Sequence, residues 1–338
     1  MARLTTFSRL LLTVLIIGGV YFAIKTFLPK FQNADAEPAA TETAVTAPGK
    51  GATAGPASSS ETWGKGSGTP ASFTFTPPAP VNGTLKGVVE LGATGFNSFI
   101  IKSDAPKNWK LEKAEYGASL VYENLATEDD IKKGLKNYIA DMLAYGVGPK
   151  NIHFVISSGA KKVPVTTTVS NLLKGMGYVV NEVTPEQEAK LALRSCLPAS
   201  YYGNAFVVDI GSGNTKISWM SGGTPTGIEL PGAKYRQSGK TDAAVYQEVS
   251  AKAKQVPGGM RKTCFIIGGV PFELAKQTRT GKERYTVLKA PGGYTGEGDK
   301  QQGGLNIYKS IADATGCQQF VFDWDANFTI GFLLNLPK

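Results

Sequence analysis

The chain has 338 residues, of which 42% are hydrophobic, and its formal net charge is +9 at pH 7. This length allows two domains with sizeable hydrophobic cores, and the positive charge favours anionic partners such as phosphates or an acidic membrane surface. The three cysteines are widely spaced and odd in number, which supports neither a disulfide framework nor a metal cluster, and the sequence contains no nucleic-acid-binding motif.

The N-terminal segment predicts a membrane anchor. Leu10 to Leu28 is apolar apart from Thr13, Tyr21, Lys25 and Thr26, and it is long enough to span a bilayer if the Lys25 side chain reaches the interface. Basic residues flank both of its ends, so the positive-inside rule favours an extracytoplasmic folded domain only weakly. A cleaved signal peptide with a site at residues 34–36 is the alternative. We therefore expect residues 1–31 to form a single-pass anchor in the cell membrane, with its orientation left open.

A change of composition follows the anchor. From residue 32 to about residue 80 the chain consists mainly of Ala, Thr, Pro, Gly and Ser. Such a segment buries too little apolar surface to offset the entropy lost on ordering, and it is expected to be a disordered tether. The folded part is then expected to begin near Val81.

A glycine-containing hairpin is predicted at Gly87–Lys102, with the sequence GVVELGATGFNSFIIK. An apolar strand carries Glu90, a glycine and a short polar turn follow, and a second apolar strand returns. A glycine in such a turn leaves room for a phosphate to approach the backbone. The candidate phosphate ligands of this hairpin are Gly92, Ala93, Thr94, Asn97 and Ser98.

The middle of the chain predicts alternating strands and helices. A helix is predicted at Thr127–Tyr145, which Thr127 caps and in which Ile131, Leu135, Ile139 and Leu143 recur at helical spacing. His153 is interpreted as a core residue, so Ser/His/Asp catalysis is not expected. The other expected elements are strands at Trp109–Glu123 and Val179–Val183, a buried strand that runs into a polar loop within Asn151–Val163, and helices at Val165–Met176 and Glu186–Ser195.

A second hairpin, NAFVVDIGSGNTKISWM at Asn204–Met220, repeats the order of the first. Asp209 ends its apolar strand, where a carboxylate could hold a hydrated divalent cation. Taken alone, the stretch also fits an ordinary hairpin with a glycine turn. A third element, CFIIGGVPFELA, combines an apolar strand, Gly268, Gly269 and a helix start. The candidate phosphate ligands of the second hairpin are Gly211, Ser212, Gly213, Asn214 and Thr215.

Two such hairpins a domain's length apart indicate two duplicated domains that face each other across a cleft. With the third element, the chain resembles the superfamily of sugar kinases, heat-shock chaperones and actin. The resemblance implies an α/β fold of two ribonuclease-H-like, or actin-like, domains at 81–183 and 184–338. It further implies that the hairpins grip a phosphate chain and that Gly268 and Gly269 bind a nucleotide.

Two further motifs narrow this resemblance. The sequences VTPEQEAKLAL and VVDIGSGNTK resemble the exopolyphosphatase and guanosine pentaphosphate phosphohydrolase (Ppx/GppA) family. The match places Glu188 on the family's catalytic glutamate and Asp209 on its metal-linked aspartate. SSGAK matches a phosphate-binding loop, with Ser158 in it and Lys161 where an arginine is usual. The resemblance implies hydrolysis of a phosphoanhydride in polyphosphate or a nucleotide polyphosphate, with Mg²⁺ near Glu90 and Asp209.

Several departures from the family pattern keep other functions open. Glu90 replaces an aspartate, Lys216 stands where the family has glutamate, and Thr184-Pro185 replaces Ser-Gly. Near the C-terminus, NFTIGFLL lacks the family's charged pair. Glu188 also fits a solvated helix residue, because EQEAK gives ordinary charge pairing along a helix.

Three function classes therefore remain. They are a membrane-tethered phosphohydrolase, an actin-like nucleotide-binding scaffold, and a sensor of phosphorylated ligands with a degenerate site. An exported domain would meet little ATP, which would favour the sensor. The expected partners are a phosphate-bearing small molecule or polyphosphate and the membrane, not nucleic acid, and a homodimer is left open.

Overall fold

The computed structural model describes residues 73–92, 95–116, 127–161 and 163–337. The predicted anchor at Leu10–Leu28 and residues 32–72 of the predicted tether lie outside these ranges. Within the described ranges, no helix has both the length and the apolar character needed to cross a bilayer.

Two aromatic residues correct the expected start of the folded part at Val81. The ring centroid of Phe73 lies 5.5 Å from that of Phe265 and 5.1 Å from that of Tyr285, both edge to face. Phe75 makes a similar contact with Tyr201 at 5.9 Å. Large rings gain substantial free energy from burial, so Phe73 and Phe75 pack against the core although their neighbours in sequence are polar.

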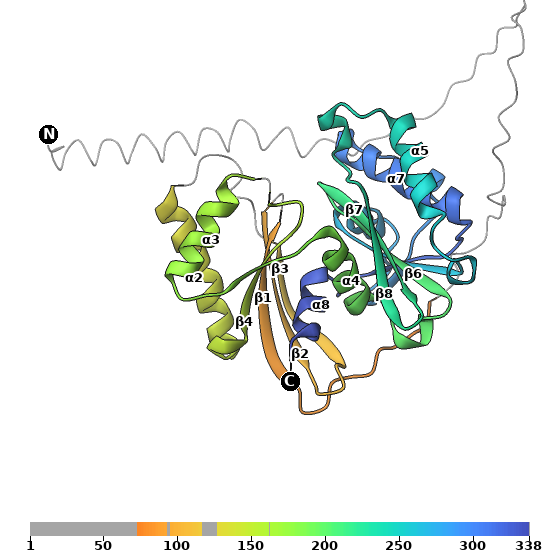
Figure 1. Cartoon of the computed structure of the whole chain (residues 1–338). Coiled ribbons are helices and arrows are strands. Elements are labelled where there is room, and N and C mark those ends of the chain that lie inside the picture. Colours follow the sequence, from red (N-terminus) through yellow and green to blue (C-terminus); the bar gives the residue numbers. More distant parts are fainter. Residues whose placement is uncertain (1–72, 93–94, 117–126, 162, 338) are drawn as a thin grey trace, which may run out of the picture. The chain divides into compact units, whose positions relative to one another are not determined.

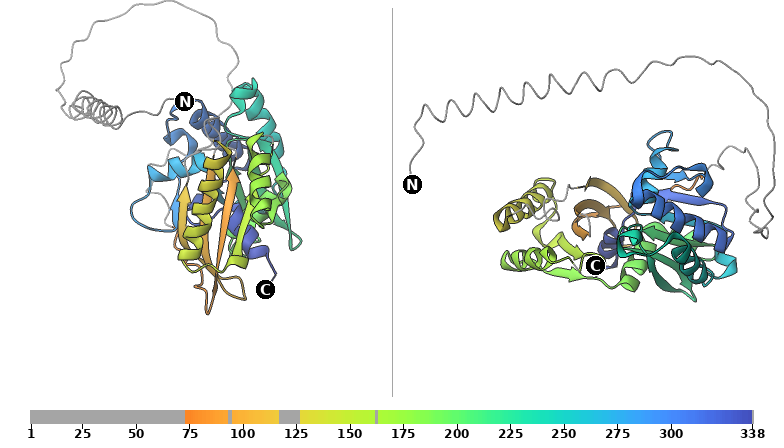
Figure 2. Two further views of the ribbon diagram at one scale, coloured as in Figure 1. Left: turned by 90° about the vertical axis from the view of Figure 1, so that its left-hand side faces the viewer. Right: turned by 90° about the horizontal axis from the view of Figure 1, so that it is seen from above.

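The first sheet has five strands in the order β3-β2-β1-β4-β5. β1 pairs antiparallel with β2, β2 pairs antiparallel with β3, and β4 and β5 extend the sheet in parallel. Helices α2 and α3 cover its outer face (Figures 1 and 2). The bounds are β1 (Thr84–Gly92), β2 (Gly95–Ser103), β3 (Trp109–Tyr116), β4 (Ile152–Ile156), β5 (Val180–Glu182), α2 (Glu128–Ala144) and α3 (Val165–Gly175).

Helix α2 starts as the sequence predicts. The Thr127 side chain accepts a hydrogen bond from the Asp130 amide at 3.3 Å and caps the helix. The buried face of α2 differs from the predicted one at its last position. Met142 is buried beneath Gly87, whereas Leu143 is 42% exposed. The expected apolar stripe is therefore turned by one residue at the C-terminal end of the helix.

The second sheet has six strands in the order β10-β11-β9-β6-β7-β8. The β6–β7–β8 meander with β9 parallel to β6 repeats the arrangement of β1–β2–β3 with β4 parallel to β1, which confirms the predicted duplication. The bounds are β6 (Ala205–Ile210), β7 (Asn214–Ser221), β8 (Thr224–Pro231), β9 (Thr263–Ile267), β10 (Tyr285–Val287), β11 (Phe320–Asp323), α5 (Asp242–Ala253), α6 (Gly269–Lys276) and α7 (Gly298–Thr315). Short 3-10 turns lie at Pro149–Asn151, Ala199–Tyr201, Tyr235–Ser238, Gly258–Met260 and Pro291–Gly293.

Helices α4 (Pro185–Cys196) and α8 (Phe328–Asn335) lie between the two sheets (Figure 1). They approach so closely that a Cβ atom added to Gly331 would lie 1.9 Å from the Leu191 carbonyl oxygen. Thr184-Pro185, which replaces the Ser-Gly of the Ppx/GppA pattern, still starts α4, because Thr184 caps the helix and Pro185 occupies its first turn. Helix α8 packs on β1 and β2 as well as on α4, so the end of the chain reaches the first sheet.

Candidate active site

The two glycine hairpins line one cleft of about 320 Å³. Glu90 and Asp209, the acids of the two predicted hairpins, both line it. Glu188 lines it from the first turn of α4. The cleft therefore brings together the acidic residues that the sequence picks out. Other predicted residues that line it are Gly92, Asn97, Gly211, Ser212, Gly213, Asn214, Gly268 and Gly269.

Strand register aligns the charged groups of the second hairpin. Asp209 on β6 lies directly opposite Lys216 on β7, and Lys216 lies opposite Glu229 on β8. Directly opposed residues of antiparallel strands point to the same face of a sheet. Glu90 and Asn97 form the equivalent pair of the first hairpin. The neutral Asn97 and the cationic Lys216 therefore occupy corresponding positions.

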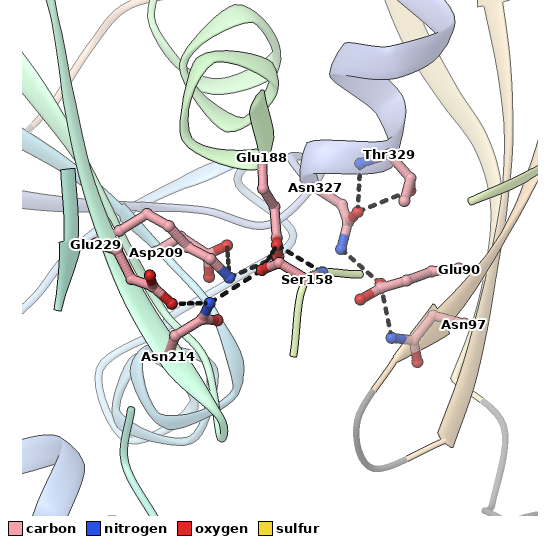
Figure 3. A network of polar contacts seen from close by, with 10 residues as sticks. Glu90, Asn97, Ser158, Glu188, Asp209, Asn214, Glu229, Asn327 and Thr329 are labelled. Carbon is pink, nitrogen blue, oxygen red and sulfur yellow. Dashed lines mark hydrogen bonds and ion pairs between the residues drawn. The ribbon is translucent and has the colours of Figure 1, made fainter. Parts of the chain in front are cut away.

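The Glu188 carboxylate accepts hydrogen bonds on both oxygens (Figure 3). The Lys216 ammonium donates to Oε1 at 2.5 Å, and the Ser158 amide donates to Oε2 at 3.0 Å. The Ser158 hydroxyl also donates to Oε2 and accepts from Asn214 Nδ2 at 2.9 Å. Because Glu188 is only 2% exposed, it is not the solvated helix residue of the alternative interpretation.

Glu90 is held by two side-chain amides (Figure 3). Asn97 Nδ2 donates to its Oε2 at 3.0 Å, and Asn327 Nδ2 donates to the same oxygen at 3.1 Å. Burial raises the pKa of Glu90 to about 7 in spite of the hydrogen bond from Asn97. Asn327 also caps α8 by accepting from the Thr329 amide at 2.8 Å. One residue thus links the last helix to the first hairpin, and its only sequence signal is an asparagine before an apolar run.

Asp209 and Lys216 influence each other across β6 and β7. Burial raises the pKa of Asp209, and the nearby Lys216 opposes this shift. Burial acts to lower the pKa of Lys216, but the carboxylates of Asp209 and Glu188 outweigh it and the pKa is raised. The Lys216 side chain is 4% exposed and is therefore a buried ammonium at neutral pH.

A divalent cation does not fit between the carboxylates of Glu188 and Asp209. Mg²⁺ needs oxygen ligands at about 2.0–2.1 Å in near-octahedral geometry. The Lys216 ammonium, 2.5 Å from Glu188 Oε1 and 4.0 Å from Asp209 Oδ2, occupies the space where those oxygens converge. Repulsion between a dication and an ammonium 4 Å apart is about 8 kcal/mol at an effective dielectric constant of about 20. Within the described residues, no three His, Cys, Asp or Glu side chains gather into a metal site.

Close backbone approaches explain two of the glycines. A Cβ atom on Gly211 would lie 2.6 Å from the Asn214 carbonyl oxygen. Gly268 has φ +106° and lies against the Ile210 backbone, where a Cβ atom would come within 2.4 Å. In the described part of the chain, the Ser212 and Gly213 amides have no acceptor. These two amides are thus free to donate to an anion in the cleft.

Other predicted residues lie elsewhere. Lys161 is not among the residues that line the cleft, and its ammonium pairs with Glu182 at 3.2 Å on the surface. Ser98 and Thr215 are buried within their sheets, opposite Val89 and Ile210 respectively. Ala93 and Thr94 lie outside the described residues.

Lys300 is a basic residue of the cleft that sequence reasoning missed. It lies on α7, and its ammonium is 3.6 Å from the position of a Cβ atom on Gly269. No local motif marks it, because the fold alone brings α7 to this turn. Aromatic residues Tyr116, Phe272, Phe322 and Trp324 also line the cleft.

Comparisons with solved structures identify the fold. Two Aquifex aeolicus structures, one described as a Ppx/GppA phosphatase and the other as a PPX-GPPA enzyme, are 16% and 18% identical to the chain, with TM-scores of 0.56 and 0.58. They cover 74% and 75% of this chain and 98% and 99% of their own. An exopolyphosphatase from Cytophaga hutchinsonii is 12% identical over 74% of this chain and 96% of its own, with a TM-score of 0.56.

No protein-family model and no curated protein matches the sequence. The described part of the chain thus has the fold of Ppx/GppA structures, as the hairpin motifs predict. At this level of identity the likeness is one of fold.

Proposed function

We propose that this chain hydrolyses the terminal phosphoanhydride bond of a polyphosphate or a nucleotide polyphosphate. The observation that carries the proposal is the position of Glu188. Its carboxylate is buried and lines the same cleft as the glycine turns of the two hairpins. The fold shared with Ppx/GppA structures supports the same reaction class.

The cleft supplies donors for a phosphate chain. The free amides of Ser212 and Gly213 and the ammonium groups of Lys216 and Lys300 can bind phosphoryl oxygens. In the reaction, the oxygen of a water molecule attacks the terminal phosphorus. The bridging P–O bond breaks, and its electron pair leaves with the shortened chain. Glu188 Oε1 takes the proton from the water.

Ligand binding would also release the base. In the structure, Oε1 holds the Lys216 ammonium at 2.5 Å. A phosphoryl oxygen that binds this ammonium competes with Glu188 for its hydrogens, and the competition frees Oε1 to accept a proton. Ser158 keeps Oε2 in place through its amide and hydroxyl groups. Turnover would therefore depend on occupation of the cleft.

Binding without turnover is the second candidate function. The hydrogen bonds on both oxygens of Glu188 favour it, because donors already occupy both oxygens and neither is left free to accept a proton from water. In that case the chain would act as a sensor of, or a scaffold controlled by, phosphate-bearing ligands.

Phosphate release from the full chain tests the proposal. Tripolyphosphate, ATP and guanosine pentaphosphate are supplied separately, and orthophosphate is measured together with ligand binding. We expect release by the wild type, and Glu188→Gln should reduce it by about 100-fold or more with little change in binding. Glu186→Gln, which alters an exposed carboxylate of the same helix turn, is the control. Binding without release would establish the second candidate, and no binding would overturn both.

We also propose that residues 1–31 tether the protein to the cell membrane. The support is the apolar stretch Leu10–Leu28 with basic residues on both sides. Fractionation of cells that produce the full chain tests this proposal. The protein should sediment with membranes after an alkaline carbonate wash and be released by detergent. Release by carbonate alone would contradict it.

A further inference from the structure

We infer that Lys216 is the resident cation of this cleft and that phosphate-bearing ligands bind to it without a divalent metal. The inference rests on the proposed function for the ligand class, and it concerns the cofactor of that site. The resemblance to Ppx/GppA proteins implies magnesium near Asp209, but the arrangement of the side chains leaves no place for it there.

The position of Lys216 carries the inference. Its strand register places the ammonium on the same face as Asp209 and Glu229, and the first turn of α4 brings Glu188 to it. A positive charge is therefore fixed at the point where carboxylate oxygens from two elements converge. The side chain is 4% exposed, so surrounding groups hold the charge in place.

The ammonium retains capacity for a ligand. A lysine ammonium has three N–H donors. Within the described residues, one of them is used in a hydrogen bond to Glu188, and Asp209 Oδ2 lies at 4.0 Å, beyond hydrogen-bond distance. Lys216 also lines the cleft and lies 3.8 Å from the position of a Cβ atom on Gly211, the glycine of the second turn. A phosphoryl oxygen at that turn can therefore accept a hydrogen bond from Lys216.

The two hairpins differ in the charge of the residue that lies opposite their acid. Asn97 corresponds to Lys216 and donates an amide hydrogen to Glu90 at 3.0 Å. The first hairpin therefore pairs its acid with a neutral amide, and the second pairs its acid with a cation. We expect the most negative part of the ligand, its terminal phosphoryl group, to bind on the side of Lys216.

Titration of the full chain with Mn²⁺ alone, followed by electron paramagnetic resonance, tests directly whether a divalent metal binds near Asp209. The wild type should show no stoichiometric Mn²⁺ binding that depends on Asp209. Mn²⁺ bound by the wild type and lost in Asp209→Asn would overturn the inference. The decisive measurement uses the wild type, so it does not depend on whether a variant folds. Lys216→Glu, which replaces the ammonium with a carboxylate beside those of Asp209 and Glu188, should create a Mn²⁺ site.

Calorimetric binding of tripolyphosphate tests the role of Lys216 as the cation. For the wild type, the Kd measured in EDTA should be no larger than the Kd measured in excess Mg²⁺. Glu188→Gln keeps the ammonium and should retain binding. Lys216→Met combined with Glu188→Gln removes both charges of the pair and should weaken binding by about tenfold or more, as expected for a lost charged hydrogen bond. Near-ultraviolet circular dichroism checks that both variants are folded.

The outcomes distinguish the inference about Lys216 from the proposed hydrolysis. Binding that requires Mg²⁺, or equal binding by the single and double variants, would overturn the inference and leave hydrolysis standing. Absence of tripolyphosphate binding in both buffers would overturn the proposed function and, with it, the ligand role of Lys216.

Discussion

The ammonium nitrogen of Lys216 lies 2.5 Å from Glu188 Oε1, and the two side chains are only 4% and 3% exposed. A buried ion pair adds little stability relative to a well-packed apolar pair, but removal of one partner leaves an uncompensated charge. The pair is therefore a sensitive point of the fold as well as of the site.

Lys216→Met should destabilise the protein strongly. Loss of the ammonium leaves the buried Glu188 carboxylate without its cation, which typically costs about 3–5 kcal/mol. Adding Glu188→Gln removes the unpaired charge, so the double variant should be more stable than Lys216→Met alone. Urea denaturation at neutral pH measures both. Equal stability of the single and double variants would contradict the pairing.

The stability of the protein should fall as the pH rises between about 5 and 8. The pKa of Glu90 is raised from 4.5 to about 7, so the folded state holds a proton in this range that the unfolded state has released. Loss of that proton costs up to about 3 kcal/mol of unfolding free energy, at about 1.4 kcal/mol per pH unit. Burial acts on Asp209 in the same direction. Urea denaturation as a function of pH should show the decline.

Glu90→Gln is the variant that tests the assignment. It keeps the size of the side chain and removes the titration, so it should flatten the decline. Asn327→Asp, in contrast, keeps an acceptor for the Thr329 amide but replaces the donor to Glu90 with a carboxylate. It should raise the pKa of Glu90 further and move the decline to higher pH. An unchanged pH profile in both variants would show that other groups govern it.

Gly331→Ala should be far more damaging than Gly134→Ala. The added methyl group at Gly331 would lie 1.9 Å from the Leu191 carbonyl oxygen, so α4 and α8 must separate, at a cost of about 1–3 kcal/mol. At Gly134, on α2, nothing lies within 4 Å, and alanine should stabilise the helix by about 0.5–1 kcal/mol. Thermal denaturation of the two variants compares them, and similar midpoints would contradict the tight packing of α4 on α8.

Much of the fold could be predicted because its signals are local. The run of apolar residues before Asp209 and the glycines after it define a strand and a turn, and the repeat of that order at Glu90 indicates duplication. The cap at Thr127 is a similar local signal. Phe73 and Phe75 carry no such signal, because the rings against which they pack, those of Tyr201, Phe265 and Tyr285, lie far away in the sequence.

The site could be predicted only in part, for a similar reason. The match of motifs identifies Glu188 and shows Lys216 as a departure, but the partners of Lys216 depend on strand register and on the approach of α4. Asn327 reaches Glu90 across 237 positions of sequence. Lys161 follows a central strand as a phosphate-binding residue would, yet Glu182 on the neighbouring β5 pairs with it at the surface. Contacts between distant elements decide each of these cases.

Lys300→Ala should weaken the binding of tripolyphosphate, whereas Lys161→Ala should leave it unchanged. Lys300 lines the cleft beside Gly269, and burial and the nearby Lys234 lower its pKa, so a phosphate anion would stabilise its charged form. Loss of one charged hydrogen bond corresponds to about 10-fold to 100-fold in Kd. Lys161 is already paired with Glu182, outside the cleft. Calorimetry on both variants compares two lysines of equal charge. If Lys161→Ala weakens binding and Lys300→Ala does not, the phosphate chain lies along the loop after β4 and not beside Gly269.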